Sequence, residues 1–216
     1  MVKIAPSILS ADFANLERDI HDIERSGADW VHVDVMDGMF VPNISIGIPV
    51  VKALRPVTSL PLDVHLMIDR PIRYAEEFIK AGADWLTIHL ESDQPQNTLA
   101  CLDKIRAMGC KAAISLKPKT PAEAAIPYLA KCDMVLVMTV EPGFGAQKFM
   151  ADMMPKLKKL RRMLGEVNPA CILEVDGGVD AVTYKTCREN GAEVLVTGSA
   201  YFKAADRAAF VEALRK

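Results

Sequence analysis

RSGADWVHVDV, from Arg25 to Val35, joins the end of a helical pattern to the start of a strand. Gly27 stands where a helix needs a left-handed residue after its last turn. The run from Trp30 then alternates with the period of two that is typical of a β-strand. Two other stretches repeat this order, KAGADWLTIHL from Lys80 to Leu90 and ENGAEVLVTGS from Glu189 to Ser199. The chain is therefore built from a repeated unit of helix, turn and strand.

This unit, used as a template, predicts eight strands along the chain, at Lys3 to Leu9, Trp30 to Met36, Leu62 to Met67, Trp85 to His89, Lys111 to Leu116, Met134 to Thr139, Cys171 to Asp176 and Glu193 to Thr197. A helical pattern follows each strand, at Asn15 to Ser26, Gly47 to Leu54, Ile72 to Ala81, Thr98 to Met108, Pro121 to Ala130, Met150 to Leu164, Ala181 to Asn190 and Asp206 to Leu214.

Eight strand-helix units of about 27 residues each predict an α/β protein of the (β/α)8 TIM-barrel class. The units leave no segment for a second domain, so residues 1–216 are expected to form a single barrel domain. An open, doubly wound sheet is the structural alternative. The count of eight favours the barrel, as does the lack of a G-x-G-x-x-G sequence after the first strand.

Composition narrows the classes of partner. The 216 residues are 50% hydrophobic and carry a net charge of -2, so no basic surface for nucleic acid or an anionic membrane is indicated. The five cysteines show no CxxC spacing, which fits a reducing compartment better than a disulfide framework or a thiolate metal site. The chain has neither a signal-peptide pattern nor a bilayer-length apolar run. We expect a mature cytoplasmic protein that acts on a small molecule.

The strand VHVDVM carries polar side chains on one face. Val31, Val33 and Val35 share one face, whereas His32 and Asp34 share the other with a methionine. In a barrel the valines pack outward against helices, and the polar face points inward near the carboxyl-terminal mouth, where barrel enzymes keep their chemistry. The polar face is therefore predicted to be a site.

A metal ion is the first hypothesis for this site. A lone inward histidine is more often a hydrogen-bonded core residue, but His32 and Asp34 can converge with His65 and Asp176 from other strands. Two imidazoles and two carboxylates at one mouth favour a divalent cation. Zinc suits this set of ligands, and manganese, iron and cobalt remain open.

The carboxylates of Asp34 and Asp176 also predict acid–base chemistry. They come from strands 2 and 7, on different sides of the ring, so a flat intermediate between them would meet one carboxylate on each face. Such a pair can remove a proton from one face and return one to the other. The strand LTIHLE adds further polar residues at its end, His89 and Glu91.

Glycine-rich turns follow the last three strands, as VEPGFGAQ (Val140 to Gln147), DGGV (Asp176 to Val179) and TGSA (Thr197 to Ala200). Such turns let backbone N–H groups approach a phosphate, which barrels of this class bind after strands 7 and 8. Each turn taken alone is weak evidence, because most glycine turns only reverse the chain. Together they predict a phosphate subsite.

In order along nearly the whole chain, these motifs resemble the ribulose-phosphate 3-epimerase family: APSILSADF, HVDVMDGMFVPN, DVHLM, MTVEPGFGAQKF, EVDGGV and GSA. The resemblance implies interconversion of D-ribulose 5-phosphate and D-xylulose 5-phosphate in the pentose phosphate pathway. It also implies a divalent metal, usually zinc, and a homo-oligomer of barrels. No redox cofactor is needed for this reaction.

The resemblance assigns roles to particular residues. The metal ligands are His32, Asp34, His65 and Asp176, and the acid–base pair is Asp34 and Asp176. The substrate-binding residues would contact the substrate, mainly at its phosphate end, or line the wall of the pocket. They are Ser7, His65, Gly143, Phe144, Gly145, Ala146, Gly177, Gly178, Gly198, Ser199, Met36, Met67 and Met138.

Two positions depart from the family pattern. Many relatives have glycine where Ala146 stands, and alanine resists a positive φ angle. Many also have asparagine where Lys117 stands. Neither departure touches the predicted ligands.

Three other functions share part of this pattern. An epimerase for a six-carbon substrate such as allulose 6-phosphate would use every catalytic residue named above. A sugar-phosphate lyase or decarboxylase is a second alternative, although no inward lysine is evident on the central strands. A non-catalytic sugar-phosphate binder is the third, and it would have no need of two opposed carboxylates.

Overall fold

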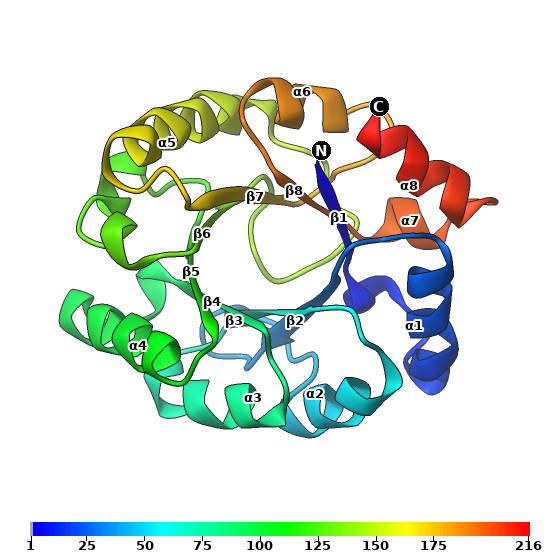
Figure 1. The fold of residues 1–216 in the computed structure, drawn as a ribbon, viewed down its shortest axis with the longest axis horizontal. Coiled ribbons are helices and arrows are strands. Elements are labelled where there is room, and N and C mark those ends of the chain that lie inside the picture. The colour runs from blue at the N-terminus through cyan, green and yellow to red at the C-terminus, as the bar shows by residue number, and fades with distance from the viewer. Residues whose placement is uncertain (1) are drawn as a thin grey trace.

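The protein is described by a computed structural model covering residues 2–216, in which eight parallel strands form one sheet in the order β1-β8-β7-β6-β5-β4-β3-β2. The strands surround a central axis and the helices form a ring outside them (Figure 1). The predicted α/β barrel is therefore confirmed. The strands are β1 Lys3–Pro6, β2 Val31–Met36, β3 Leu62–Met67, β4 Trp85–His89, β5 Lys111–Leu116, β6 Met134–Met138, β7 Ile172–Asp176 and β8 Val194–Thr197.

The ring closes between β1 and β2 through a thin seam. A single parallel bridge joins Ser7 to His32, and the backbone N–H groups of Asp29 and Trp30 donate to the carbonyl of Ile4. Strand β1 ends at Pro6, earlier than predicted, because the chain turns into a 3-10 helix over residues 8–10. This turn places Ser7 beside His32 at the mouth of the barrel.

The outer ring contains α1 Leu16–Arg25, α2 Ile48–Leu54, α3 Ala75–Ala81, α4 Pro95–Ala107, α5 Met154–Val167, α6 Tyr184–Glu189, α7 Ser199–Phe202 and α8 Arg207–Arg215. The helices predicted from Ile72 and Ala181 begin later, at Ala75 and Tyr184. The short helix α7 was not predicted. It directly follows β8 and carries Ser199 at its first position.

The α-helix predicted at Pro121 to Ala130 is wrong. This connection contains only two 3-10 turns, at Ala122–Ala125 and Leu129–Lys131. Pro127 lies between them and has no backbone N–H, so it cannot donate the hydrogen bond that a continuous helix needs at that point. The connection still covers the outside of the barrel, because its residues Ala122, Ala125 and Leu129 are buried.

The two faces of the strands differ as the alternating pattern predicted. Val31, Val33 and Val35 are buried in the large core between strands and helices.

The five cysteines are buried and free, which agrees with the absence of a predicted disulfide framework. Within residues 2–216, no helix has both the length and the apolar character needed to cross a membrane.

Candidate active site

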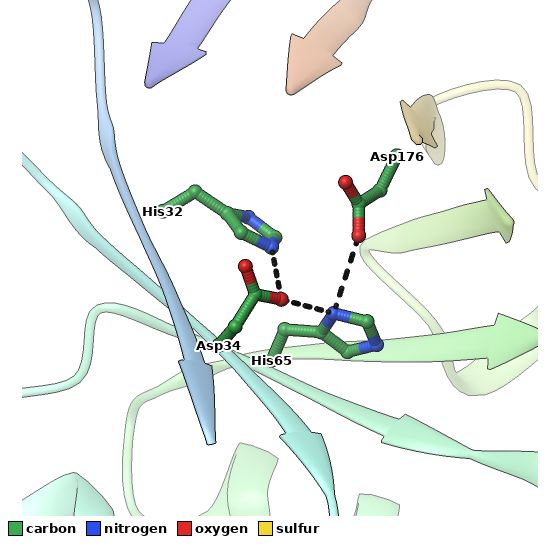
Figure 2. A group of neighbouring side chains, drawn as sticks. All are labelled: His32, Asp34, His65 and Asp176. Atoms are coloured by element: carbon green, nitrogen blue, oxygen red, sulfur yellow. Dashed lines mark hydrogen bonds and ion pairs between the residues drawn. The ribbon is translucent and has the colours of Figure 1, made fainter. Parts of the chain in front are cut away.

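Four side chains converge at the carboxyl ends of the strands (Figure 2). His32 and Asp34 lie on β2, His65 on β3, and Asp176 is the last residue of β7. Asp34 Oδ1 lies 3.3 Å from His32 Nε2 and 3.1 Å from His65 Nδ1. Asp176 Oδ2 lies 3.7 Å from the same nitrogen of His65. The structure thus brings together the four residues that the sequence singled out.

The spacing of these atoms fits a metal ion. One ligand atom from each residue lies within 4.8 Å of every other. Atoms bound at about 2.0–2.2 Å to one tetrahedral zinc ion stand about 3.3–3.6 Å apart, close to the three separations given above. Nitrogen and oxygen ligands of this kind suit zinc, manganese, iron(II) or cobalt. The residues therefore fit a divalent cation.

The two carboxyl groups have opposite proton affinities. Burial raises the pKa of Asp34, but the charges and hydrogen bonds of His32 and His65 outweigh burial and hold that pKa well below its usual range. Burial and the nearby charge of Asp34 raise the pKa of Asp176 to about 6. One carboxyl group is therefore an anion, while the other readily carries a proton.

Each of three converging side chains is oriented from behind by another polar group. The Ser7 hydroxyl donates to Asp34 Oδ2. His32 Nδ1 lies 2.6 Å from Asp63 Oδ2. Burial lowers the pKa of His32, but the charges of Asp34 and Asp63 outweigh burial and raise that pKa well above its usual value. His65 Nε2 lies 2.9 Å from a nitrogen of His89. Second partners of this kind fix which nitrogen a histidine presents to a metal.

A cavity of about 360 Å³ opens above the four side chains. Asp34 and Asp176 line it, whereas His32 and His65 lie beneath its surface and are fully buried. All the other predicted substrate-binding residues line this cavity as well, at Ser7, Met36, Met67, Met138, Gly143, Phe144, Gly145, Ala146, Gly177, Gly178, Gly198 and Ser199.

The glycines at the far end of the cavity permit four loops to pack closely in two pairs. A Cβ atom on Gly178 would lie 2.7 Å from the backbone nitrogen of Phe149, and one on Gly198 would lie 2.9 Å from the Ser10 hydroxyl. The loop after β6 folds across the centre of the barrel toward these turns (Figure 1). Close loop packing thus explains Gly178 and Gly198 and forms one end of the cavity.

Known proteins match the chain over its full length. A model of the ribulose-phosphate 3 epimerase family matches residues 3–202. The chain belongs to the ribulose-phosphate 3-epimerase family. The Bacillus subtilis ribulose-phosphate 3-epimerase is 49% identical, covering 100% of this chain and 99% of its own. The chloroplastic ribulose-5-phosphate-3-epimerase of Arabidopsis thaliana is 47% identical, covering 98% of this chain and 75% of its own. The predicted family and its enzyme class, an epimerase among the isomerases, are confirmed.

Solved structures of more distant proteins share the barrel of this epimerase family member. A 3-hexulose-6-phosphate synthase superposes with a TM-score of 0.71 at 20% identity, over 99% of this chain and 98% of its own. A 3-keto-L-gulonate-6-phosphate decarboxylase from Vibrio cholerae gives 0.74 at 14% identity, over 100% and 96%. At such low identity the likeness concerns the fold alone.

The structure shows the backbone conformation and the contacts of Ala146 and Lys117, the two departures from the epimerase family pattern. Ala146 adopts a left-handed backbone with φ of 58°, the conformation that alanine resists. The Lys117 ammonium lies 3.7 Å from the ring centre of Phe40, so it makes a cation–π contact at the rim of the mouth. Lys117 does not touch the four converging side chains.

Sequence reasoning missed two groups near the site of this epimerase family member. Ser10 lines the cavity, with its hydroxyl beside Gly198. Its place in the motif APSILSADF was a usable signal, although only Ser7 was chosen from that motif. His89 was noted as a polar strand end without a role, yet it lies directly behind His65. No spacing rule places β4 behind a residue of β3, so only the structure shows this contact.

Proposed function

We propose that the protein interconverts D-ribulose 5-phosphate and D-xylulose 5-phosphate in the pentose phosphate pathway. The observation that carries this proposal is the pair of carboxyl groups that approach His65 Nδ1 from different sides (Figure 2). The carbon to be inverted is next to a ketone, so its proton is acidic enough to be taken by a positioned carboxylate. Inversion requires that a second group return a proton to the other face.

His32, Asp34, His65 and Asp176 would hold one divalent cation per subunit, and we propose zinc. When bound, the cation would stabilise the negative charge that develops on the substrate's oxygens. Two features of this chain support the proposal: the separations between the ligand atoms, and the partners of His32 and His65 that leave Nε2 and Nδ1 facing the cluster.

Asp34 and Asp176 would exchange acid and base roles with the direction of reaction. The base takes the proton of the reacting carbon, leaving an enediolate, and the acid protonates the opposite face. The pKa of Asp34 is lowered and that of Asp176 is raised to about 6, so the resting protein can hold one ionised and one protonated carboxyl group. Environments that separate the pKa values of two carboxyl groups are typical of an acid–base pair.

The other end of the cavity would hold the phosphate. The turns Gly177–Gly178 and Gly198–Ser199 line it together with the loop from Gly143 to Ala146. Backbone N–H groups of such turns bind an anion without needing a basic side chain. The side chains of Met36, Met67 and Met138 line the cavity wall between the proposed metal end and the proposed phosphate end. A flexible apolar side chain can adapt to a sugar there.

We also propose a cytoplasmic protein that assembles as a homo-oligomer of barrels. Five buried free thiols support a reducing compartment. Large apolar side chains at the rim support assembly, since Met39 and Ile44 are 79% and 78% exposed. Phe144, in the loop after β6, is 55% exposed as well.

Turnover in deuterium oxide tests the two-base proposal. Product should carry solvent deuterium at the inverted carbon. Asp176→Asn should keep the fold and lose about 10²–10⁴-fold in rate, because an amide can neither take nor give the proton. Asp206→Asn, at the remote start of α8, is the matched control and should keep the parent rate. Full retention of the original proton over many turnovers would refute the mechanism.

A comparison of substrates tests the proposed specificity. The zinc-loaded protein should epimerise D-ribulose 5-phosphate faster than allulose 6-phosphate at equal concentration. A higher kcat/KM for the six-carbon substrate would reassign the protein to that reaction. Cleavage or decarboxylation products would indicate a lyase, and binding with no turnover of either sugar would indicate a binder.

A further inference from the structure

His89 lies behind the metal-site residue His65 and takes no part in the cavity. It is the last residue of β4, its side chain is fully buried, and its ring centroid lies 5.0 Å from that of His65 with the two ring planes inclined by 25°. His89 Nε2 lies 2.9 Å from His65 Nε2, and His89 Nδ1 lies 3.2 Å from Glu91 Oε2. The three residues thus form a chain leading away from the site.

The donors in this chain can be assigned from Glu91 outward. Glu91 Oε1 accepts hydrogen bonds from the backbone N–H of Lys117, at 2.9 Å, and from the Thr120 hydroxyl. A carboxylate only accepts, so the ring nitrogen facing its other oxygen must be the donor. His89 therefore carries its proton on Nδ1 and presents a bare Nε2 to His65.

The assignment continues through His65. Two ring nitrogens that face each other need one proton between them. Because His89 Nε2 is the acceptor, His65 Nε2 is the donor. The neutral His65 ring then has its lone pair on Nδ1, which faces Asp34 Oδ1 at 3.1 Å and Asp176 Oδ2 at 3.7 Å. A metal ion requires this lone pair.

We infer that His89 and Glu91 are positioning residues that hold His65 in the tautomer and orientation needed to bind the metal. This inference rests on the metal site proposed above. The pair also ties that site to two loops. Glu91 binds the loop after β5 at Lys117 and Thr120. Phe40, from the loop after β2, packs against His89, with the two ring centroids 4.8 Å apart.

Substitutions at residue 89 separate positioning from packing. His89→Leu removes the acceptor and should weaken zinc binding about 10–100-fold, the range found when outer partners of ligand histidines are lost. His89→Gln keeps an amide oxygen that can accept from His65, so it should retain most of the affinity. Thr87→Val is the matched control, because Thr87 is equally buried on the same strand and its hydroxyl has no protein partner.

Zinc affinity would be measured by competition with a chromophoric chelator on the full-length protein, with cobalt absorption as a second readout of the ligand geometry. Circular dichroism would confirm that each variant is folded. A His89→Leu protein that binds zinc within about twofold of the parent would overturn the inference. Equal losses in His89→Leu, His89→Gln and Thr87→Val would show a purely structural role and would overturn it too.

A spectroscopic test does not depend on any variant. The chain has only four histidines, so their ring nitrogens can be resolved by ¹⁵N NMR. In the zinc-loaded protein His89 should be protonated on Nδ1, and a proton on its Nε2 would contradict the inference. A parent protein that binds no zinc, cobalt or manganese would refute the metal site itself, which distinguishes that failure from a failure confined to His89.

Discussion

The barrel interior has two ends that are built from the same strands and differ in chemistry. Toward the amino ends, the floor is apolar and includes Trp30, Trp85, Met134, Ile172 and Val194. Trp30 and Trp85 pack with ring centroids 4.9 Å apart. At the carboxyl ends, the same inward faces carry the carboxyl and imidazole groups of the site.

The difference shows that an inward face does not by itself make a residue functional. Position along the strand decides its role, because apolar side chains fill the floor whereas carboxyl and imidazole groups gather where the strands end at the cavity. Between the two ends lies a buried polar layer with Asp63 and Glu174. Burial and the neighbouring Asp63 raise the pKa of Glu174 well above its usual value.

A substitution at the mouth should give the largest effect, and chiefly on activity. Asp34→Asn removes one of the two proposed acid–base groups and a charge that His32 and His65 contact. We expect kcat/KM to fall by about 10²–10⁴-fold. Steady-state kinetics with zinc content measured in the same samples would test this. A variant that keeps the parent rate would place the acid–base pair elsewhere.

A substitution at the floor should show the reverse. Met134 is fully buried in the apolar floor, and Met134→Ala should lower the free energy of unfolding by about 2–5 kcal/mol through lost burial and a cavity. Activity per folded molecule should stay at the parent value. Urea unfolding followed by tryptophan fluorescence would measure the loss. A fall in kcat in the folded protein would show that floor and mouth are coupled.

Metal removal should expose a pH effect that belongs to the mouth. Without the metal, the pKa of Asp176 is about 6 in the folded protein, whereas the ordinary value for an aspartate, which applies to the unfolded chain, is 3.8. Between these two pKa values the folded state binds more protons than the unfolded state. The free energy of unfolding therefore falls as the pH rises from about 4 to about 6. Subtracting the curve of metal-free Asp176→Asn isolates this contribution. Zinc should abolish the fall, and a difference curve that rises with pH would contradict the assignment.

The smallest effect is expected in the loop that covers the mouth. Ala146 has φ of 58°, and Ala146→Gly relieves left-handed strain of about 1–2 kcal/mol, partly offset by the backbone freedom that glycine adds. The thermal midpoint should rise by about 1–3 °C. Ala213→Gly, inside helix α8, should lower it instead. Calorimetry would compare the two, and a lower midpoint for Ala146→Gly would refute the strain.

Sequence reasoning located most of the barrel and the site. The bounds of β3, β4 and β5 were predicted to the residue. The fifth helix failed because two 3-10 turns around Pro127 bury enough apolar surface to imitate an amphipathic pattern. The four converging residues could be singled out because carboxylates and histidines on inward faces are rare in a core unless they have a task.

The amino-acid sequence by itself determined the repeated unit, the inward and outward faces of each strand, and the residues that meet at the mouth. These properties follow from local periodicity and from the turns at glycine, both of which act over a few residues. Only the tertiary structure decided which nitrogen each histidine presents. That choice depends on contacts between His32 and Asp63, and between His65 and His89, which lie 31 and 24 residues apart in the chain. The pairing of neighbouring strands brings these residues together, and the geometry of their hydrogen bonds then orients the two imidazole rings.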